Sequence, residues 1–146
     1  MARPTSRCVK VSAIIYLVDA GPVVGLFNRN DQWHAWSASV LTVLDEPLAT
    51  TEIVWAEVCH LLRNDRPCLL AAVNAVKTGR LRLLPVWEQA DRIGTLLEKY
   101  PHTDVGDASL VVLSEKLPKA KIITTDVRDF TVYRRFRNAP LPLIHP

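Results

Sequence analysis

Four carboxylates in this chain stand where a folded protein could bring them into one pocket. Each lies at the end of an apolar segment or on the apolar side of a helix-like segment. Grouped carboxylates repel each other by a few kcal/mol per pair, at ~5 Å and an effective dielectric constant of about 20. Such a pocket needs a cation, and a set of oxygen ligands suits Mg²⁺ or Mn²⁺. The four residues are Asp19, Glu57, Asp107 and Asp126.

A divalent ion held by carboxylates predicts a particular reaction. Such ions commonly bridge to substrate phosphates, activate a bound water as a nucleophile and stabilise the leaving oxygen. The set therefore predicts hydrolysis of a phosphodiester, with the four acids as candidate catalytic residues. Attack by water in line leaves a 5′-phosphate and a 3′-hydroxyl, and the ribose 2′-hydroxyl has no role as nucleophile.

Two of these acids follow predicted strands. Residues 14–18 form a β-branched and aromatic run without polar alternation, which predicts a central strand covered on both faces and stopping at Asp19. Residues 121–125 form a second strongly β segment, which stops at Asp126. Because ligands of open parallel sheets bind at the carboxyl ends of the strands, we expect both aspartates at one edge of the sheet.

The other two acids lie on predicted helices. Residues 52–63 carry apolar side chains at helical spacing, and Glu57 belongs to the same stripe, so we expect its carboxylate to point toward the interior. Asp107 lies in the first turn of a helix predicted over residues 104–117, where a negative charge is favourable. It also falls on the apolar side of that helix.

Predicted strands and helices alternate along the whole chain. The remaining predicted strands cover residues 47–50, 81–84 and 141–144. The remaining predicted helices cover residues 23–27, 32–43, 67–77 and 87–100. Alternation predicts an α/β fold with a mainly parallel sheet and right-handed crossovers. Since no low-complexity linker interrupts the pattern, we expect one domain over residues 14–146, preceded by an N-terminal arm of residues 1–13.

The composition is that of a globular protein. The 146 residues are 49% hydrophobic and 23% charged, and three cysteines without a CxxC pair favour a reducing, cytoplasmic location. The net charge of +3 is compatible with a polyanionic partner and does not demonstrate one. No apolar run approaches the ~18 residues of a membrane span, so no membrane partner is expected.

Local structure alone can explain some of the acids. Asp104 and Asp107 have the spacing of a capping box with an acidic third position. Asp126 and Asp129 can form an Asx turn. Asp19 has no such explanation, because it stands too far before the predicted helix at residues 23–27 to cap it well. Glu57 has none either, since no basic residue follows it by four positions.

Four segments of the chain resemble the PIN-domain ribonucleases, and in particular toxins of the VapC type. They occur in the family's order, at residues 17–27, 56–62, 104–111 and 123–130. The resemblance implies a three-layer α/β/α sandwich with Mg²⁺- or Mn²⁺-dependent endoribonuclease activity on RNA. It also implies frequent homodimerisation and a cognate antitoxin protein.

The resemblance assigns roles position by position. It gives metal-binding roles to the aspartate after the first strand, the helical glutamate, the aspartate before the Ala-Ser-Leu helix and the last acid: Asp19, Glu57, Asp107 and Asp126. Asp104 matches a further acidic position of many members and is included as a metal ligand, with the choice between Asp104 and Asp107 as the direct ligand left open. Gly106 stands where alanine is more usual.

Basic residues follow the last acid of the set. Arg128, Arg134 and Arg135 could hold RNA phosphates near the site, and a solvated terminal face explains them equally well. Two rival functions stay open at this point. One is a catalytically inactive PIN-like module that binds RNA or protein; the other is a phospho-accepting receiver-like domain, which would place an acidic pair directly after the first strand.

Overall fold

The computed structural model describes residues 14–146, so the arm expected at residues 1–13 lies outside the described residues. The strands are β1 (Tyr16–Val18), β2 (Leu48–Thr51), β3 (Leu81–Leu84), β4 (Lys121–Ile123) and β5 (Leu143–Ile144). The helices are α1 (Ala20–Phe27), α2 (His34–Leu41), α3 (Glu52–Leu61), α4 (Arg66–Lys77), α5 (Ala90–Lys99), α6 (Val105–Lys116) and α7 (Val127–Phe130). Short 3₁₀ turns, η2 (Trp87–Gln89) and η3 (Phe136–Asn138), complete the order.

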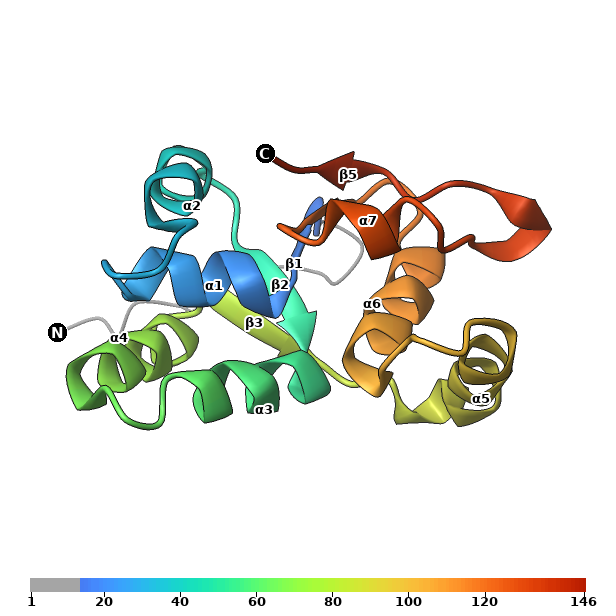
Figure 1. Cartoon of the computed structure of the whole chain (residues 1–146), viewed down its shortest axis with the longest axis horizontal. Coiled ribbons are helices and arrows are strands. Elements are labelled where there is room, and N and C mark those ends of the chain that lie inside the picture. Colours follow the sequence, from blue (N-terminus) through green and yellow to red (C-terminus); the bar gives the residue numbers. More distant parts are fainter. Residues whose placement is uncertain (1–13) are drawn as a thin grey trace, which may run out of the picture.

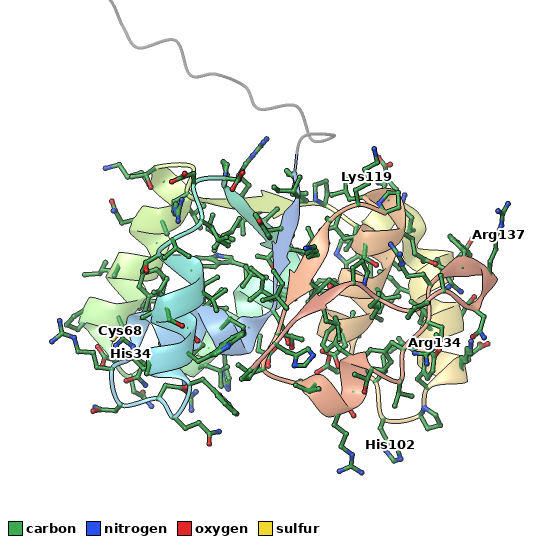
Figure 2. All side chains as sticks on the ribbon, turned by 90° about the horizontal axis from the view of Figure 1, so that it is seen from above. His34, Cys68, His102, Lys119, Arg134 and Arg137 are labelled. Atoms are coloured by element: carbon green, nitrogen blue, oxygen red, sulfur yellow. The ribbon has the colours of Figure 1, made fainter. Side chains whose placement is uncertain are left out.

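The five strands form one parallel sheet in the order β3-β2-β1-β4-β5. Right-handed crossovers in the two directions away from β1 place helices on opposite faces. Helices α1 to α4 cover one face, and α5, α6 and α7 cover the other (Figure 1). Figure 2 looks down on the same arrangement, with the strands between the two helical layers. The predicted α/β fold with a mainly parallel sheet and helices on both sides is confirmed.

The two strands next to each other at the centre carry the predicted buried runs. Leu17 and Val18 on β1, and Ile122 and Ile123 on β4, have no exposed surface. An unbroken apolar run is required there because helices cover both faces of the strand. The residues that follow β1 and β4 are therefore held at the carboxyl edge of a rigid core.

The start of α1 differs from the sequence prediction. The helix begins at Ala20, not at residue 23, and Asp19 is its N-cap, with the side chain accepting a hydrogen bond from the Ala20 amide. Pro22 fits in the first turn, where a missing N–H costs nothing. The expectation that Asp19 could not cap this helix was wrong, because the apolar residues before Pro22 are helical as well.

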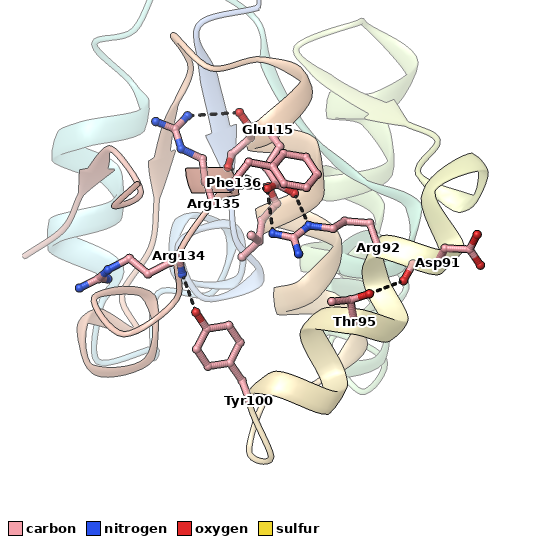
Figure 3. Close-up of polar contacts among 10 residues, drawn as sticks. Asp91, Arg92, Thr95, Tyr100, Glu115, Arg134, Arg135 and Phe136 are labelled. Carbon is pink, nitrogen blue, oxygen red and sulfur yellow. Dashed lines mark hydrogen bonds and ion pairs between the residues drawn. The ribbon is translucent and has the colours of Figure 1, made fainter. Parts of the chain in front are cut away.

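Polar contacts tie the C-terminal segment to α5 and α6 (Figure 3). Arg92 donates from Nε and Nη2 to the carboxylate of Glu115, at 3.0 and 2.9 Å. Glu115 also accepts from the Phe136 amide at 2.7 Å, and its side chain is only 4% exposed. The Arg134 amide donates to the Tyr100 hydroxyl at 3.0 Å. These contacts fix the segment that carries Tyr133 next to the N-terminus of α6.

Within residues 14–146, no helix is long and apolar enough to cross a lipid bilayer.

Candidate metal centre

The acids predicted from the sequence meet at the carboxyl edge of the sheet. Asp19 comes directly after β1, and Asp126 follows the neighbouring strand β4. The charges of Glu57 and Asp126 both act on Asp19, and the charges of Asp19, Asp104 and Asp126 act on Asp107. Glu57 is in turn affected by Asp104. One acidic cluster thus joins two strand ends with the facing helices α3 and α6.

Asp19 is the most buried member, with 8% of its surface exposed. One carboxylate oxygen accepts from the Ala20 amide at 2.8 Å, and the other accepts from the Thr124 hydroxyl at 2.9 Å. Burial raises its pKa to about 6 although both hydrogen bonds lower it, and the neighbouring carboxylates add to the rise. Asp19 is therefore held in one orientation, and its ionised form is destabilised when no cation is bound.

Asp107 is half-buried in the first turn of α6. Its Oδ2 accepts a hydrogen bond from the Tyr133 hydroxyl at 2.7 Å. Burial raises the pKa of Asp107 to about 7, the Tyr133 hydrogen bond lowers it, and three nearby carboxylates raise it further. Burial also raises the pKa of Tyr133, so this phenol stays a proton donor at neutral pH. Its ring packs edge-on against Tyr100 and Phe130.

Asp126 combines a local and a site role. Its Oδ1 accepts from the Asp129 amide at 3.1 Å and caps α7, so the local turn anticipated from the sequence is present. Its carboxylate also lies with those of Asp107 and Asp129, since one oxygen from each falls within 4.8 Å of the others. Asp129 was not among the predicted ligands, although its spacing of three from Asp126 could have indicated a shared side of a short helix.

Asp104 and Glu57 form the exposed side of the cluster. Asp104 caps α6, and its Oδ1 accepts from the Asp107 amide at 2.8 Å. Glu57 is solvent-exposed, so the expectation that it points toward the interior was wrong. Partial burial and the charge of Asp104 nevertheless raise the pKa of Glu57. A Cβ atom on Gly106 would lie 3.2 Å from Asp104 Oδ1 and 3.6 Å from Glu57 Oε2, which places both acids beside this glycine.

The three arginines predicted to bind RNA have different surroundings. Arg134 donates from Nη1 to backbone carbonyls at the C-terminal end of α7, at 2.6 Å from Thr131 and 2.9 Å from Tyr133. Arg135 donates to the carbonyls of Ser114 and Pro118, at the end of α6 away from Asp107. Arg128 is exposed on α7, next to Asp129.

The donor set at this edge consists of oxygen atoms. Three acids offer oxygens close enough to share one ion, and Asp19 shares their electrostatic environment. The raised pKa values reflect carboxylates that are buried together without compensating positive charge. A hard divalent cation would remove that repulsion, and the residues present fit Mg²⁺ or Mn²⁺.

Comparison with known proteins finds one matching family model and several solved structures with a similar fold. A family model described as the PIN domain matches residues 16–135. No curated protein matches the sequence. Among solved structures, the chain resembles Mycobacterium tuberculosis VapC20, described as a toxin that cleaves the sarcin-ricin loop, with a TM-score of 0.61 and 18% identity over 73% of this chain and 86% of the other.

Two further solved structures are toxin–antitoxin assemblies. A toxin–antitoxin complex from Klebsiella pneumoniae matches with a TM-score of 0.62 and 18% identity, over 87% of this chain and 97% of the other. VapBC2 from Rickettsia felis, bound to a DNA fragment from its promoter, matches with a TM-score of 0.62 and 16% identity, over 91% of this chain and 99% of the other. At these identities the likeness is one of fold.

Proposed function

Because this chain belongs to the PIN domain family, we propose that it is a Mg²⁺- or Mn²⁺-dependent endoribonuclease that hydrolyses RNA phosphodiester bonds. The observation that carries the proposal is the convergence of Asp19, Asp107 and Asp126 at the carboxyl edge of the sheet. Ionised carboxylates placed this close together repel one another strongly unless a cation is bound. A structural role alone does not require them to face one another.

The side chains divide into those that would hold the ion and those at the rim. Asp19, Asp107 and Asp126 are the proposed inner ligands, and Asp129 joins them because its carboxylate lies in the same group. A divalent ion bound there supplies Lewis-acid activation of water and stabilisation of the leaving oxygen. Hydrogen bonds from Thr124 and Tyr133 orient the inner carboxylates before any ion arrives.

The exposed acids have a different proposed role. Glu57 and Asp104 lie on the solvent side of the cluster, where RNA must approach. We assign them to the metal site at its rim, where they would contact the ion directly or through water. The products are expected to carry a 5′-phosphate and a 3′-hydroxyl, since water would attack the phosphorus and the bond to the ribose O3′ would break.

The biological setting that we propose is that of a VapBC-type toxin, acting in the cytoplasm as a homodimer with a cognate antitoxin. The solved structures that share the fold include a toxin and two toxin–antitoxin assemblies, which supports this setting. Exposed apolar side chains on α3 and α4 also support a protein partner, because Leu61, Leu70 and Val73 are 51%, 60% and 45% exposed.

A cleavage assay tests the proposal. The wild-type chain should cut RNA with Mn²⁺ or Mg²⁺ and lose the activity in EDTA. Asp19→Asn should lower the rate by at least ~100-fold, because removing a charged ligand removes preorganised electrostatic stabilisation of the transition state. Asp45→Asn, which changes an exposed acid before β2 at the opposite edge of the sheet, should leave the rate unchanged.

Two outcomes would contradict the proposal. Undiminished cleavage in EDTA or by Asp19→Asn would mean that the acidic cluster is not the active site. Calorimetry that detects RNA binding without Mn²⁺ binding would instead favour a catalytically inactive PIN-like binding module.

A further inference from the structure

A hollow lies against the acidic cluster, on the side of α7 and the loop that precedes α6. It has a volume of about 240 Å³, and its lining includes Asp129, a member of the cluster, and Tyr133, which donates to Asp107. Sites for drug-sized ligands measure ~300–1,000 Å³, so this hollow is large enough for only a small planar group. Whatever binds there must lie beside any phosphate that is held at the acidic edge.

The walls of the hollow are mostly apolar and rigid. Tyr100, Pro101 and Val132 line it, and Val132 is 57% exposed. The Tyr100 ring packs edge-on against Tyr133 with the ring centroids 5.2 Å apart. Its hydroxyl accepts from the Arg134 amide, which fixes the ring from the other end (Figure 3). Such a wall offers contact area to a flat apolar group without a large cost in side-chain ordering.

The rim of the hollow carries positive charge. Arg128 lines it and is exposed. Among the described residues, the Arg128 side chain has neither a hydrogen-bond partner nor an ion-pair partner. The guanidinium group is thus available to an anion. Arg128 is next in sequence to Asp129, a member of the acidic cluster that would hold a cation. His102, which is also exposed and is labelled in Figure 2, lines the same hollow.

We propose that this hollow binds one nucleotide of the RNA next to the scissile phosphate. The base lies against Val132 and Tyr100, and the phosphate of that nucleotide contacts Arg128. This inference rests on the proposed function, since it takes the acidic edge as the place of cleavage. Proteins read unpaired RNA by splaying bases out and stacking them on aromatic or apolar surfaces. The hollow would therefore select single-stranded over double-stranded RNA.

Photo-crosslinking tests the occupant independently of activity. The full wild-type chain is mixed with Mg²⁺ and short random-sequence RNA that contains 4-thiouridine, or 6-thioguanosine in a second pool. After illumination, the modified peptides are identified by mass spectrometry. We expect cross-links within residues 99–103 and 128–133. Cross-links only elsewhere, or none at all, would overturn the proposal, whereas a lack of RNA cleavage in a parallel reaction would count against the proposed nuclease activity alone.

Two variants separate base contact from phosphate contact. Val132→Asn should weaken binding of single-stranded RNA about tenfold and leave the salt dependence unchanged, because it removes apolar contact with the base and no charge. Arg128→Gln should weaken binding of all sequences alike. It should also reduce the slope of log affinity against log salt concentration by about 0.7, the value for one phosphate contact to a single strand.

Matched controls come from the same chain. Val43→Asn changes an exposed valine that follows α2, and Arg29→Gln changes an exposed arginine beyond the C-terminal end of α1, away from Asp19. Neither control should alter the affinity or the salt slope. If Val132→Asn and Arg128→Gln behave like these controls, the hollow does not bind RNA.

Discussion

The burial of Asp19 leads to a measurable effect on stability. Its pKa is raised from 3.8 to about 6 in the folded chain. Between these values the folded protein keeps a proton that the unfolded chain has released. The unfolding free energy of the metal-free protein therefore falls as the pH rises from about 4 through about 6. At about 1.4 kcal/mol per pH unit, the full loss attributable to Asp19 is about 3 kcal/mol.

The Asp19→Asn variant isolates this contribution. Asparagine can still accept from the Ala20 amide and has no charge to lose or gain. Urea unfolding of both proteins in EDTA, at several pH values, gives the difference between wild type and variant. We expect the unfolding free energy of the wild type, measured relative to that of the variant, to fall by about 2 kcal/mol between about pH 4.5 and pH 8. Burial is the largest cause of the raised pKa of Asp107 and is common to both proteins, so that part cancels in the comparison. The smaller part that comes from the charge of Asp19 is lost in the variant and belongs to the measured difference.

Metal should reverse the loss in the wild type. At a Mn²⁺ concentration 100 times the dissociation constant, binding adds about 2.7 kcal/mol at pH 8. Asp19→Asn should gain much less. A difference between the two metal-free proteins that does not change with pH would contradict this prediction, because it would mean that Asp19 does not hold its proton more tightly in the folded state.

Two further substitutions probe the surroundings of the site. Tyr133→Phe removes the donor to Asp107 and should lower Mn²⁺ affinity tenfold or more, measured by calorimetry, because the ligand loses its fixed orientation. Gly21→Ala should lower the unfolding free energy by about 1–3 kcal/mol, since its Cβ would collide with the Thr125 hydroxyl. In contrast, Gly94→Ala on α5 should raise it by about 0.5–1 kcal/mol, because nothing lies within 4 Å of the added Cβ.

Controls make these results specific. Tyr100→Phe removes a hydroxyl that contacts the Arg134 backbone and no acid, so it should leave Mn²⁺ affinity unchanged. An equal loss in both tyrosine variants would mean that the placement of the C-terminal segment, and not the hydrogen bond to Asp107, supports the site. Equal stability of the two glycine variants would show that α1 can move away from the loop after β4.

The fold was predictable because its signals are local. The apolar runs before Asp19 and Asp126 are long enough to mark central strands, and the position of ligands at strand ends follows from the parallel sheet. The resemblance to the PIN-domain family is confirmed by the match over residues 16–135. The convergence of the acids, expected from that topology, is present in the structure.

Errors arose where a side chain's direction depends on packing. Glu57 shares a helical stripe with apolar residues, yet it is exposed at the point where α3 passes the N-terminus of α6. The helical spacing predicts which side of the helix Glu57 shares with the apolar residues. It does not predict whether a neighbouring element extends far enough to cover that position. The cap at Asp19 was missed because the helix was predicted to begin at residue 23, whereas it begins at Ala20 with Pro22 inside its first turn.

Long-range pairs could not be read from the sequence at all. Tyr133 and Asp107 are 26 residues apart, and no periodicity links them. The roles of Arg134 and Arg135 depend in the same way on where the C-terminal segment crosses the ends of α7 and α6. From the sequence they formed one basic group with Arg128, but in the structure their side chains bind backbone carbonyls.

The claim that these carboxylates form a metal centre is tested most directly by crystals of the wild-type chain soaked with Mn²⁺ and measured for anomalous scattering. We expect a peak at the carboxyl edge of the sheet, within direct coordination distance of Asp19, Asp107 or Asp126, and its loss in crystals of Asp19→Asn. A peak elsewhere, or no peak at a Mn²⁺ concentration that supports RNA cleavage, would contradict the assignment of these carboxylates as metal ligands.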